Sequence, residues 1–178
     1  MSACDVLDVI ALFEQHAIEV IIDGGWAVDA LLGEQTRPHS DLDIAMPHKH
    51  VALARQLLEE RGYRDVPRDD TRDCNFVLAD DQEHTVDFHS YTYGESGSLL
   101  FGLPYPLESL QGVGLIAGHQ VRCITPEWLV KFHTGYPLDE DDVHDVLALC
   151  RQFSLELPPE YIEFMHPNHC SQTSHIHG

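Results

Sequence analysis

"VIIDGGWAVDALLGEQTRPHSDLDIAM", residues 20–46, joins an apolar β-branched run to a second run in which acids alternate with hydrophobic residues. The first run is too short for a helix and ends at Gly24-Gly25, so we predict a buried strand over 18–23. The following "WAVDALLG" (26–33) has helical composition and ends in a glycine, which is typical of a helix C-terminus. The stretch therefore predicts a strand, a glycine turn, a helix and then a second strand.

The second run, "DLDIAM", places two acids on one side of an extended chain. Alternate side chains of a strand point to opposite faces, so Asp41 and Asp43 share one face while Leu42 and Ile44 share the other. Two such carboxylates, roughly 6 to 7 Å apart, repel each other and lose hydration when they are buried. A divalent cation would relieve that repulsion, whereas an edge strand with its acids in solvent would give the same pattern without a metal.

A third acid occurs in "TVDFHS", residues 85–90. Asp87 stands between Val86 and Phe88 on a strand that otherwise looks buried. Small residues such as Gly24-Gly25 at a helix start let backbone amides approach a phosphate. Three acids together with this phosphate seat favour a magnesium-dependent phosphoryl-transfer site over an edge strand.

The rest of the chain predicts an α+β domain with a small helical portion at the end. The stretch from 94 to 114 gives no clear pattern. We expect a catalytic domain over 1–124, a small helical portion packed on it over 125–164, and a disordered tail over 165–178. Beyond the segments already named, the sequence predicts a helix over 5–16 capped by Asp5, a helix over 51–63, a strand over 75–79, a hairpin over 114–124 turning at Gly118, and helices over 126–135 and 139–153.

The composition narrows the class of protein. Thirty acids against ten bases give the 178 residues a formal charge of -20, which disfavours nucleic acids and anionic membranes and suits a cationic partner or bound metal ions. No apolar run approaches the roughly 20 residues needed to span a bilayer, and no signal segment is evident, so we expect a cytoplasmic protein. The five cysteines form no C-x-x-C pair and are expected to be reduced thiols. The His-rich tail fits no closed zinc site.

On these residues the chain resembles the nucleotidyltransferase superfamily of DNA polymerase β. The signature of that superfamily is a Gly-Gly or Gly-Ser turn, D-x-D or D-x-E on one strand, and a third acid on a later strand. The G-G-W-x-x-D helix and the R-x-H-x-D-x-D segment resemble the small antibiotic nucleotidyltransferases. "VRCITPEWLVKFHTGYPLDEDDVHDV" (121–146), with its F-H-x-G-Y block, and the D-x-H of "VDFHS" resemble the small lincosamide nucleotidyltransferases.

The resemblance implies a polymerase β-like mixed sheet flanked by helices, and nucleotidyl transfer as the reaction. A drug hydroxyl would attack the α-phosphorus of ATP or another NTP, and pyrophosphate would leave. By resemblance, Asp41 and Asp43 hold Mg²⁺, and Asp87 either completes a site for two Mg²⁺ ions or takes the proton from the hydroxyl. Two metal ions can activate the nucleophile and neutralise the charge that develops on the phosphates.

Further residues are candidates for binding the nucleotide and the acceptor. Cations for the leaving pyrophosphate would come from Arg37, His39, Lys131 and His133, and the phosphates would lie against Gly24 and Gly25. Lys131 and His133 are two apart on a helix and face different ways, so we expect at most one of them to reach the triphosphate. Surface charges or core histidines are the alternative for all four. Trp26 is expected in the core, and the candidate acceptor contacts are Asp29, His89 and Tyr136.

Three acceptor classes remain open from the sequence. The first is a lincosamide-like antibiotic, which the F-H-T-G-Y block favours. An aminoglycoside would suit the charge of -20. A third possibility is a protein acceptor, as in nucleotidyltransferases of the toxin and antitoxin kind. A homodimer is compatible with each of them.

Overall fold

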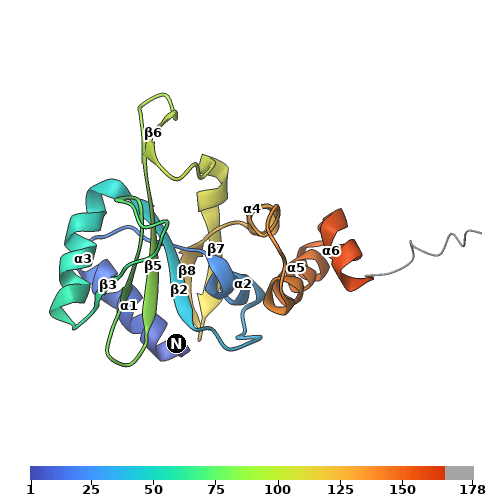
Figure 1. The fold of residues 1–178 in the computed structure, drawn as a ribbon, viewed down its shortest axis with the longest axis horizontal. Coiled ribbons are helices and arrows are strands. Elements are labelled where there is room, and N and C mark those ends of the chain that lie inside the picture. The colour runs from blue at the N-terminus through green and yellow to red at the C-terminus, as the bar shows by residue number, and fades with distance from the viewer. Residues whose placement is uncertain (167–178) are drawn as a thin grey trace, which may run out of the picture.

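A computed structural model of the protein describes residues 1–166, and its centre is a mixed β-sheet (Figure 1). The order across the sheet is β3-β4-β5-β2-β1-β8-β7, and β6 pairs with β5. This arrangement confirms the predicted α+β class with a mixed sheet. The strands are β1 (Ile21–Ile22), β2 (Asp41–Pro47), β3 (Arg64–Val66), β4 (Asn75–Ala79), β5 (Thr85–Tyr93), β6 (Leu99–Gly102), β7 (Gly112–Ile116) and β8 (His119–Cys123).

Helices cover both faces of the sheet. In Figure 1, α1 and α3 lie on one side, and α2 lies on the other side with α4, α5 and α6 stacked beyond it. The helices are α1 (Ala3–Gln15), α2 (Gly24–Leu32), α3 (Val51–Glu60), α4 (Pro126–Phe132), α5 (Glu140–Phe153) and α6 (Pro159–Met165), with the 3₁₀ turns η1 (His48–His50) and η2 (Leu107–Gln111).

The strand β2 lies in the interior of the sheet, between β1 and β5. It pairs antiparallel with β1 and parallel with β5. Its apolar residues Leu42 and Ile44 are fully buried together with Phe88 of β5, and Phe13 of α1 meets the Phe88 ring edge-on at 6.5 Å. The edge-strand alternative for the alternating acids is therefore wrong, because both edges of β2 are hydrogen-bonded.

Several start and stop signals were read correctly, and one was not. Gly33 ends α2 in the left-handed conformation (φ 79°), as predicted, and the hairpin of β7 and β8 turns at Ala117-Gly118. The helix α1 begins at Ala3, two residues earlier than predicted, because Ser2 rather than Asp5 is its N-cap. Asp5 instead completes a capping box by accepting the Ser2 amide.

Other elements were not predicted. The edge strand β3 and the helix α6 were missed, and the unassigned stretch contains β6, η2 and the start of β7. The predicted strand over 18–23 is reduced to β1. The division of the chain at residue 124 remains a prediction. The predicted disorder of the tail and the histidines beyond 166 lie outside the described residues.

Two further expectations concern the membrane and the cysteines. Within residues 1–166, none of the helices has the length and apolar character needed to cross a bilayer. The cysteines of this part of the chain, Cys4, Cys74, Cys123 and Cys150, are free thiols, as predicted.

Candidate active site

The parallel register of β2 and β5 brings two of the three predicted acids together. Asp43 is paired with Asp87 across the strands, so both side chains leave the sheet on the same face, opposite the buried Leu42 and Phe88. We call Asp43 and Asp87 the acid pair. Asp41 lies two residues before Asp43 on the same face and is paired with Thr85.

The start of α2 lies directly over this face. Asp23 is the N-cap of α2, and its Oδ1 accepts the Gly24 amide at 2.8 Å. A Cβ atom on Gly24 would lie 2.2 Å from Asp43 Oδ2, so any side chain at this position would strike the acid pair. The glycine thus lets the positive end of a helix approach the acids closely, an arrangement suited to an anionic ligand held together with a cation.

The carboxylates of the site lie close enough together to repel one another. Burial raises the pKa of Asp43 well above its ordinary value of 3.8, and the neighbouring carboxylates of Asp41, Asp23 and Asp87 raise it further. Burial also raises the pKa of Asp87, against the lowering effect of two basic neighbours. One of these is Arg68, whose Nη1 donates to Asp87 Oδ2 at 3.0 Å. Four carboxylates on one side of the sheet thus favour binding of positive charge.

The donor set fits a hard divalent cation. Asp87 Oδ1 is buried and has no hydrogen-bond partner among the described residues, and the other oxygens are carboxylates as well. Within residues 1–166, no three His, Cys, Asp or Glu side chains are arranged to hold an ion by themselves. Magnesium sites of phosphoryl-transfer enzymes typically have one or two protein carboxylates, and water and substrate phosphates supply the other ligands. Asp43 and Asp87 match that description, with Asp41 beside them.

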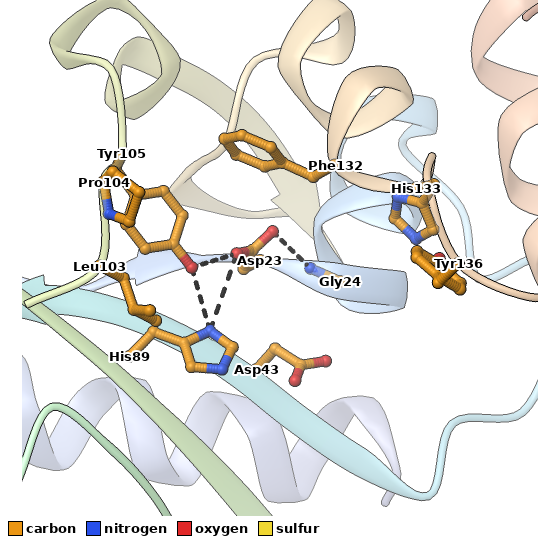
Figure 2. Close-up of a pocket in the computed structure, with 10 residues that line it drawn as sticks. All are labelled: Asp23, Gly24, Asp43, His89, Leu103, Pro104, Tyr105, Phe132, His133 and Tyr136. Atoms are coloured by element: carbon orange, nitrogen blue, oxygen red, sulfur yellow. Dashed lines mark hydrogen bonds and ion pairs between the residues drawn. The ribbon is translucent and has the colours of Figure 1, made fainter. Parts of the chain in front are cut away.

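A cavity of about 450 Å³ opens beside Asp43 of the acid pair (Figure 2). Its lining combines acidic and polar residues with apolar ones. It is built from the start of α2, from β2 and β5, from the segment between β6 and η2, and from the end of α4. The lining residues are Asp23, Gly24, Asp43, His89, Leu103, Pro104, Tyr105, Phe132, His133 and Tyr136.

A chain of hydrogen bonds runs across the cavity wall (Figure 2). Tyr105 donates its hydroxyl to Asp23 Oδ2 at 2.6 Å, and His89 Nδ1 lies 3.0 Å from the Tyr105 oxygen. The other ring nitrogen, His89 Nε2, lies 3.6 Å from Asp87 Oδ1. Tyr105 also meets the ring of Phe132 edge-on at 5.6 Å. Tyr105 therefore links α2, β5 and α4 at one point of the cavity.

The helical portion supplies the rest of the wall. We call Phe132, His133 and Tyr136 the C-terminal wall. The carbonyl of His133 accepts the hydroxyl of the fully buried Tyr161 at 2.5 Å, and Tyr136 donates its hydroxyl to Asp142 Oδ1 at 2.7 Å. The helices α5 and α6 thus fix the C-terminal wall, although neither lines the cavity.

Three of the basic candidates for nucleotide binding, and Gly25, do not line this cavity. Arg37 forms a two-pronged ion pair with Asp145, at 2.9 Å from Nε and 2.7 Å from Nη2. Lys131 places its ammonium group 4.0 Å from the centre of the Trp128 ring. His39 is buried and shares a 2.5 Å hydrogen bond with Asp29. The structure therefore leaves His133 as the predicted cation that does line the cavity.

Asp29 and Gly25 also serve the local fold. The Asp29 carboxylate is buried, and it accepts the Thr36 amide and hydroxyl as well as bonding to His39. Asp29 is thus neither in solvent nor in the cavity. A Cβ on Gly25 would lie 2.5 Å from His39 Nδ1, so this glycine makes room for the histidine. Trp26 is in the core, as expected.

Sequence reasoning missed the polar residues Asp23, Tyr105 and Arg68 of the site, and also its apolar lining residues Leu103, Pro104 and Phe132. Asp23 precedes the glycine pair and could have been recognised as a helix N-cap acid beside the phosphate seat. Tyr105 lies in the stretch without a pattern, and no signal in the sequence points to it. Arg68 lies in a polar segment before β4 and reaches Asp87 only through the tertiary fold.

Comparison with known proteins places this site in context. A family model described as aminoglycoside-2''-adenylyltransferase matches residues 5–149. A lincosamide resistance protein of Staphylococcus haemolyticus is 29% identical over 153 residues, which cover 79% of this chain and 89% of that protein. A 2''-aminoglycoside nucleotidyltransferase of Escherichia coli is 27% identical over 122 residues, which cover 68% of this chain and 67% of that protein.

A solved structure is similar to this chain in fold. The crystal structure of the lincosamide antibiotic adenylyltransferase LnuA, with lincomycin bound, superposes with a TM-score of 0.70 at 27% identity. The match covers 81% of this chain and 93% of LnuA. The two chains therefore share their fold over most of their lengths.

Proposed function

The chain belongs to the aminoglycoside-2''-adenylyltransferase family and is a nucleotidyltransferase, and from that premise we propose that it modifies a lincosamide-like antibiotic. A nucleoside monophosphate moves from ATP or another NTP to a hydroxyl of the drug, and pyrophosphate leaves. The observation that carries this proposal is the acid pair, which lies under the glycine at the start of α2 and beside a cavity large enough for a small molecule.

The chemistry can be assigned to the residues at this place. Asp43 and Asp87, with Asp41 beside them, would hold Mg²⁺. When bound, the metal supplies positive charge for the phosphates and lowers the pKa of an attacking hydroxyl. The start of α2 at Gly24 faces the phosphates with its positive end. His89 and His133 are the basic side chains of the cavity, and Arg68 lies beside Asp87.

The cavity lining supports a lincosamide over a more highly charged drug. Leu103, Pro104 and Phe132 give the cavity an apolar surface. Such a surface suits an acceptor that has an apolar part and few amines, because burying an ammonium group against it would be unfavourable. The lincosamide resistance protein and LnuA, which match most of this chain, support the same choice.

An aminoglycoside is the second candidate acceptor. The formal charge of -20 attracts polyamines, and Asp23 and Asp43 bring acids into the cavity itself. The 2''-aminoglycoside nucleotidyltransferase of Escherichia coli, which is 27% identical, supports this alternative. The two candidates differ in how much of the acceptor would contact Phe132 and its apolar neighbours.

A direct assay separates the candidate acceptors. The purified protein is incubated with ATP, Mg²⁺ and either lincomycin, clindamycin or tobramycin, and the drugs are examined by mass spectrometry. We expect lincomycin or clindamycin to gain one adenylyl group and pyrophosphate release to depend on the drug. Modification of tobramycin alone would replace the lincosamide by the aminoglycoside. Labelling of protein instead of drug would contradict both and favour a protein acceptor.

Substitution in the acid pair tests the metal assignment. Asp43→Asn should lower kcat by about 100-fold or more, because it removes a carboxylate that would hold the metal ion at the phosphates. In thermal unfolding, Mg²⁺ should raise the melting temperature of the wild type and leave Asp43→Asn unchanged. Asp81→Asn, in an exposed turn, is the matched control and should behave as the wild type. Full activity of Asp43→Asn would refute the assignment.

A further inference from the structure

Arg37 has its donor groups occupied by residues of the protein itself. Its Nε and Nη2 donate to the two carboxylate oxygens of Asp145 at 2.9 and 2.7 Å, and its Nη1 donates to Asp141 Oδ2 at 3.0 Å and to the Pro38 carbonyl at 3.2 Å. Asp145 is only 1% exposed. A guanidinium held in this way by a buried carboxylate has little freedom to turn toward a triphosphate in the cavity.

The ion pair joins two distant parts of the chain. Arg37 precedes β2, which carries Asp41 and Asp43, whereas Asp145 lies 108 positions later in the middle of α5. The helix α5 packs against both α2 and α4. Its residue Asp142 also holds the Tyr136 hydroxyl of the C-terminal wall. Arg37 thus fixes the helix that supports one wall of the cavity to the segment that leads into the catalytic strand.

The segment around Arg37 is held just as firmly on its other side. Asp29 of α2 binds Thr36 and His39, which stand one residue before and two residues after Arg37. The missing side chain of Gly25 leaves the space that Arg37 uses, since a Cβ there would lie 2.7 Å from Arg37 Nη2. The conformation of residues 36–39 is therefore determined from α2 and from α5 together.

We propose that Arg37 is a positioning residue for the acceptor: together with Asp145 it sets the C-terminal wall against the acid pair, and it does not bind the nucleotide phosphates. The proposal rests on the proposed function, because it concerns the acceptor side of the same cavity. Since Phe132, His133 and Tyr136 belong to that wall, a shift of α5 changes the space for the acceptor. Asp43 and Asp87 stay together because the pairing of β2 with β5 holds them, and that pairing does not involve Arg37.

Kinetic measurements on Arg37→Gln and Asp145→Asn test this role. Both variants should raise KM for the acceptor by roughly tenfold, since displacing binding groups by a fraction of an ångström is costly. Both should leave KM for the NTP within about threefold of the wild type, because neither residue contacts the nucleotide in this proposal. If Arg37 did bind a phosphate, its loss would weaken NTP binding by tenfold or more. Arg55→Gln, which breaks the ion pair between Arg55 of α3 and Asp65 of β3 away from the cavity, is the control and should change neither constant.

A variant that lacks both charges of the ion pair distinguishes the proposed role from a general folding defect. Arg37→Met combined with Asp145→Leu replaces the buried ion pair by apolar side chains, which proteins often tolerate better than one unpaired charge. If Arg37 acts only through Asp145, the double variant should raise the acceptor KM no more than either single change does. If Arg37 binds phosphate, the double variant should instead lose affinity for the NTP.

Two measurements decide the matter without turnover. The affinity for ATP, measured by calorimetry in the presence of Mg²⁺ and without an acceptor, should be nearly the same in the wild type, Arg37→Gln and Asp145→Asn. Amide hydrogen exchange should be faster in α4 and α5 of both variants and unchanged in β2. An ATP affinity lowered about tenfold in Arg37→Gln alone, or unchanged exchange in α5, would overturn the proposal. A failure of the proposed acceptor would leave both measurements valid.

Discussion

Asp23 caps the first turn of α2 with one carboxylate oxygen and accepts the Tyr105 hydroxyl with the other. Burial and the adjacent Asp23 raise the pKa of Tyr105 well above its ordinary value of 10.0, so the hydroxyl keeps its proton. Because that proton is donated to Asp23, the contact between Tyr105 and His89 requires a proton on His89 Nδ1. One phenol thus determines the orientation of an acid and of an imidazole in the cavity.

Removing this phenol should affect both the fold and the reaction. Tyr105→Phe removes the hydroxyl that donates to Asp23 Oδ2, so the free energy of unfolding should fall by about 1 to 3 kcal/mol. We expect kcat/KM to fall by roughly tenfold, which corresponds to about 1.4 kcal/mol of lost transition-state stabilisation. Tyr91→Phe, in which a similarly buried tyrosine is changed, is the control for urea unfolding and for kinetics. Equal effects of the two changes would contradict this role of Tyr105.

The buried bond between Asp29 and His39 predicts a dependence of stability on pH. Burial acts to raise the pKa of Asp29, but its hydrogen bonds with His39 and Thr36 outweigh burial and lower it below the ordinary 3.8. A lowered pKa in the folded state means that the carboxylate stabilises the protein above the unfolded value. This stabilisation is lost as the pH falls through the folded value.

Asp29→Asn should therefore lower the free energy of unfolding by about 1 to 3 kcal/mol at neutral pH. The difference from the wild type should be constant down to about pH 5 and shrink once the pH falls below the ordinary pKa of 3.8. Urea unfolding at a series of pH values measures it. A difference that persists undiminished at pH 2 to 3 would show that the loss is one of packing rather than of charge.

The sequence revealed the acids of the site far better than their partners. The alternation in "DLDIAM" and the lone acid in "TVDFHS" were readable because burial on one face of a strand imposes a period of two. The partners of Arg37, His39 and Lys131 were not readable. Whether a base binds phosphate, a buried acid or an aromatic ring depends on which segments the fold brings next to it. For Arg37 the deciding residue lies 108 positions away.

At the scale of single elements, the turn into α2 determines how closely a helix can approach the acids. Gly24 has a positive φ of 57°, and the position of a Cβ there is occupied by Asp43 Oδ2 at 2.2 Å. Gly33, at the other end of the same helix, has a φ of 79° and nothing within 4 Å of its missing Cβ. The two glycines both have a positive φ, but only Gly33 has room for a side chain.

This difference makes the two ends of α2 a matched pair for mutation. Gly33→Ala should cost only the left-handed strain, roughly 1 to 2 kcal/mol, with kcat unchanged. Gly24→Ala should cost that strain and also displace Asp43, so kcat should fall by roughly 100-fold. Thermal unfolding and steady-state kinetics of both variants check the prediction. Retained activity in Gly24→Ala would mean that Asp43 can move without loss of function.

The elements that the sequence predicted are those with a strong period or a strong stop signal. The helix over 139–153 and the hairpin at Gly118 are of this kind. The missed elements, β3 and α6, are short, and the residues of β3 are exposed along its whole length. The helix α6 has seven residues, which are too few for an apolar period to distinguish a helix from a loop.

At the scale of the whole molecule, the dominant feature is the formal charge of -20. Acids repel one another over distances of about 10 Å at 0.1 M salt, and the compact state concentrates this repulsion. Sodium chloride should therefore stabilise the protein. Raising the salt concentration from about 0.05 to 0.5 M should increase the melting temperature, by roughly 2 to 4 °C for each kcal/mol that the free energy of unfolding rises.

Differential scanning calorimetry in two salts separates this screening from an effect of one particular ion. The increase should be the same for sodium chloride and potassium chloride at equal ionic strength, and it should level off as the screening distance shortens toward about 3 Å at 1 M. A melting temperature that does not rise with salt would show that the acids are neutralised locally, by pairs such as Arg37 with Asp145 and Arg68 with Asp87.

The parallel pairing of β2 with β5 also bears on how the site is assembled during synthesis. Because α3, β3 and β4 lie between these strands in the chain, Asp43 and Asp87 meet only after β5 has left the ribosome. Tyr105 and the C-terminal wall follow later still, and contacts that are distant in sequence form slowly. A nascent chain that has folded through β5 therefore already holds the crowded carboxylates, and it can attract metal ions before it has any means of holding an acceptor.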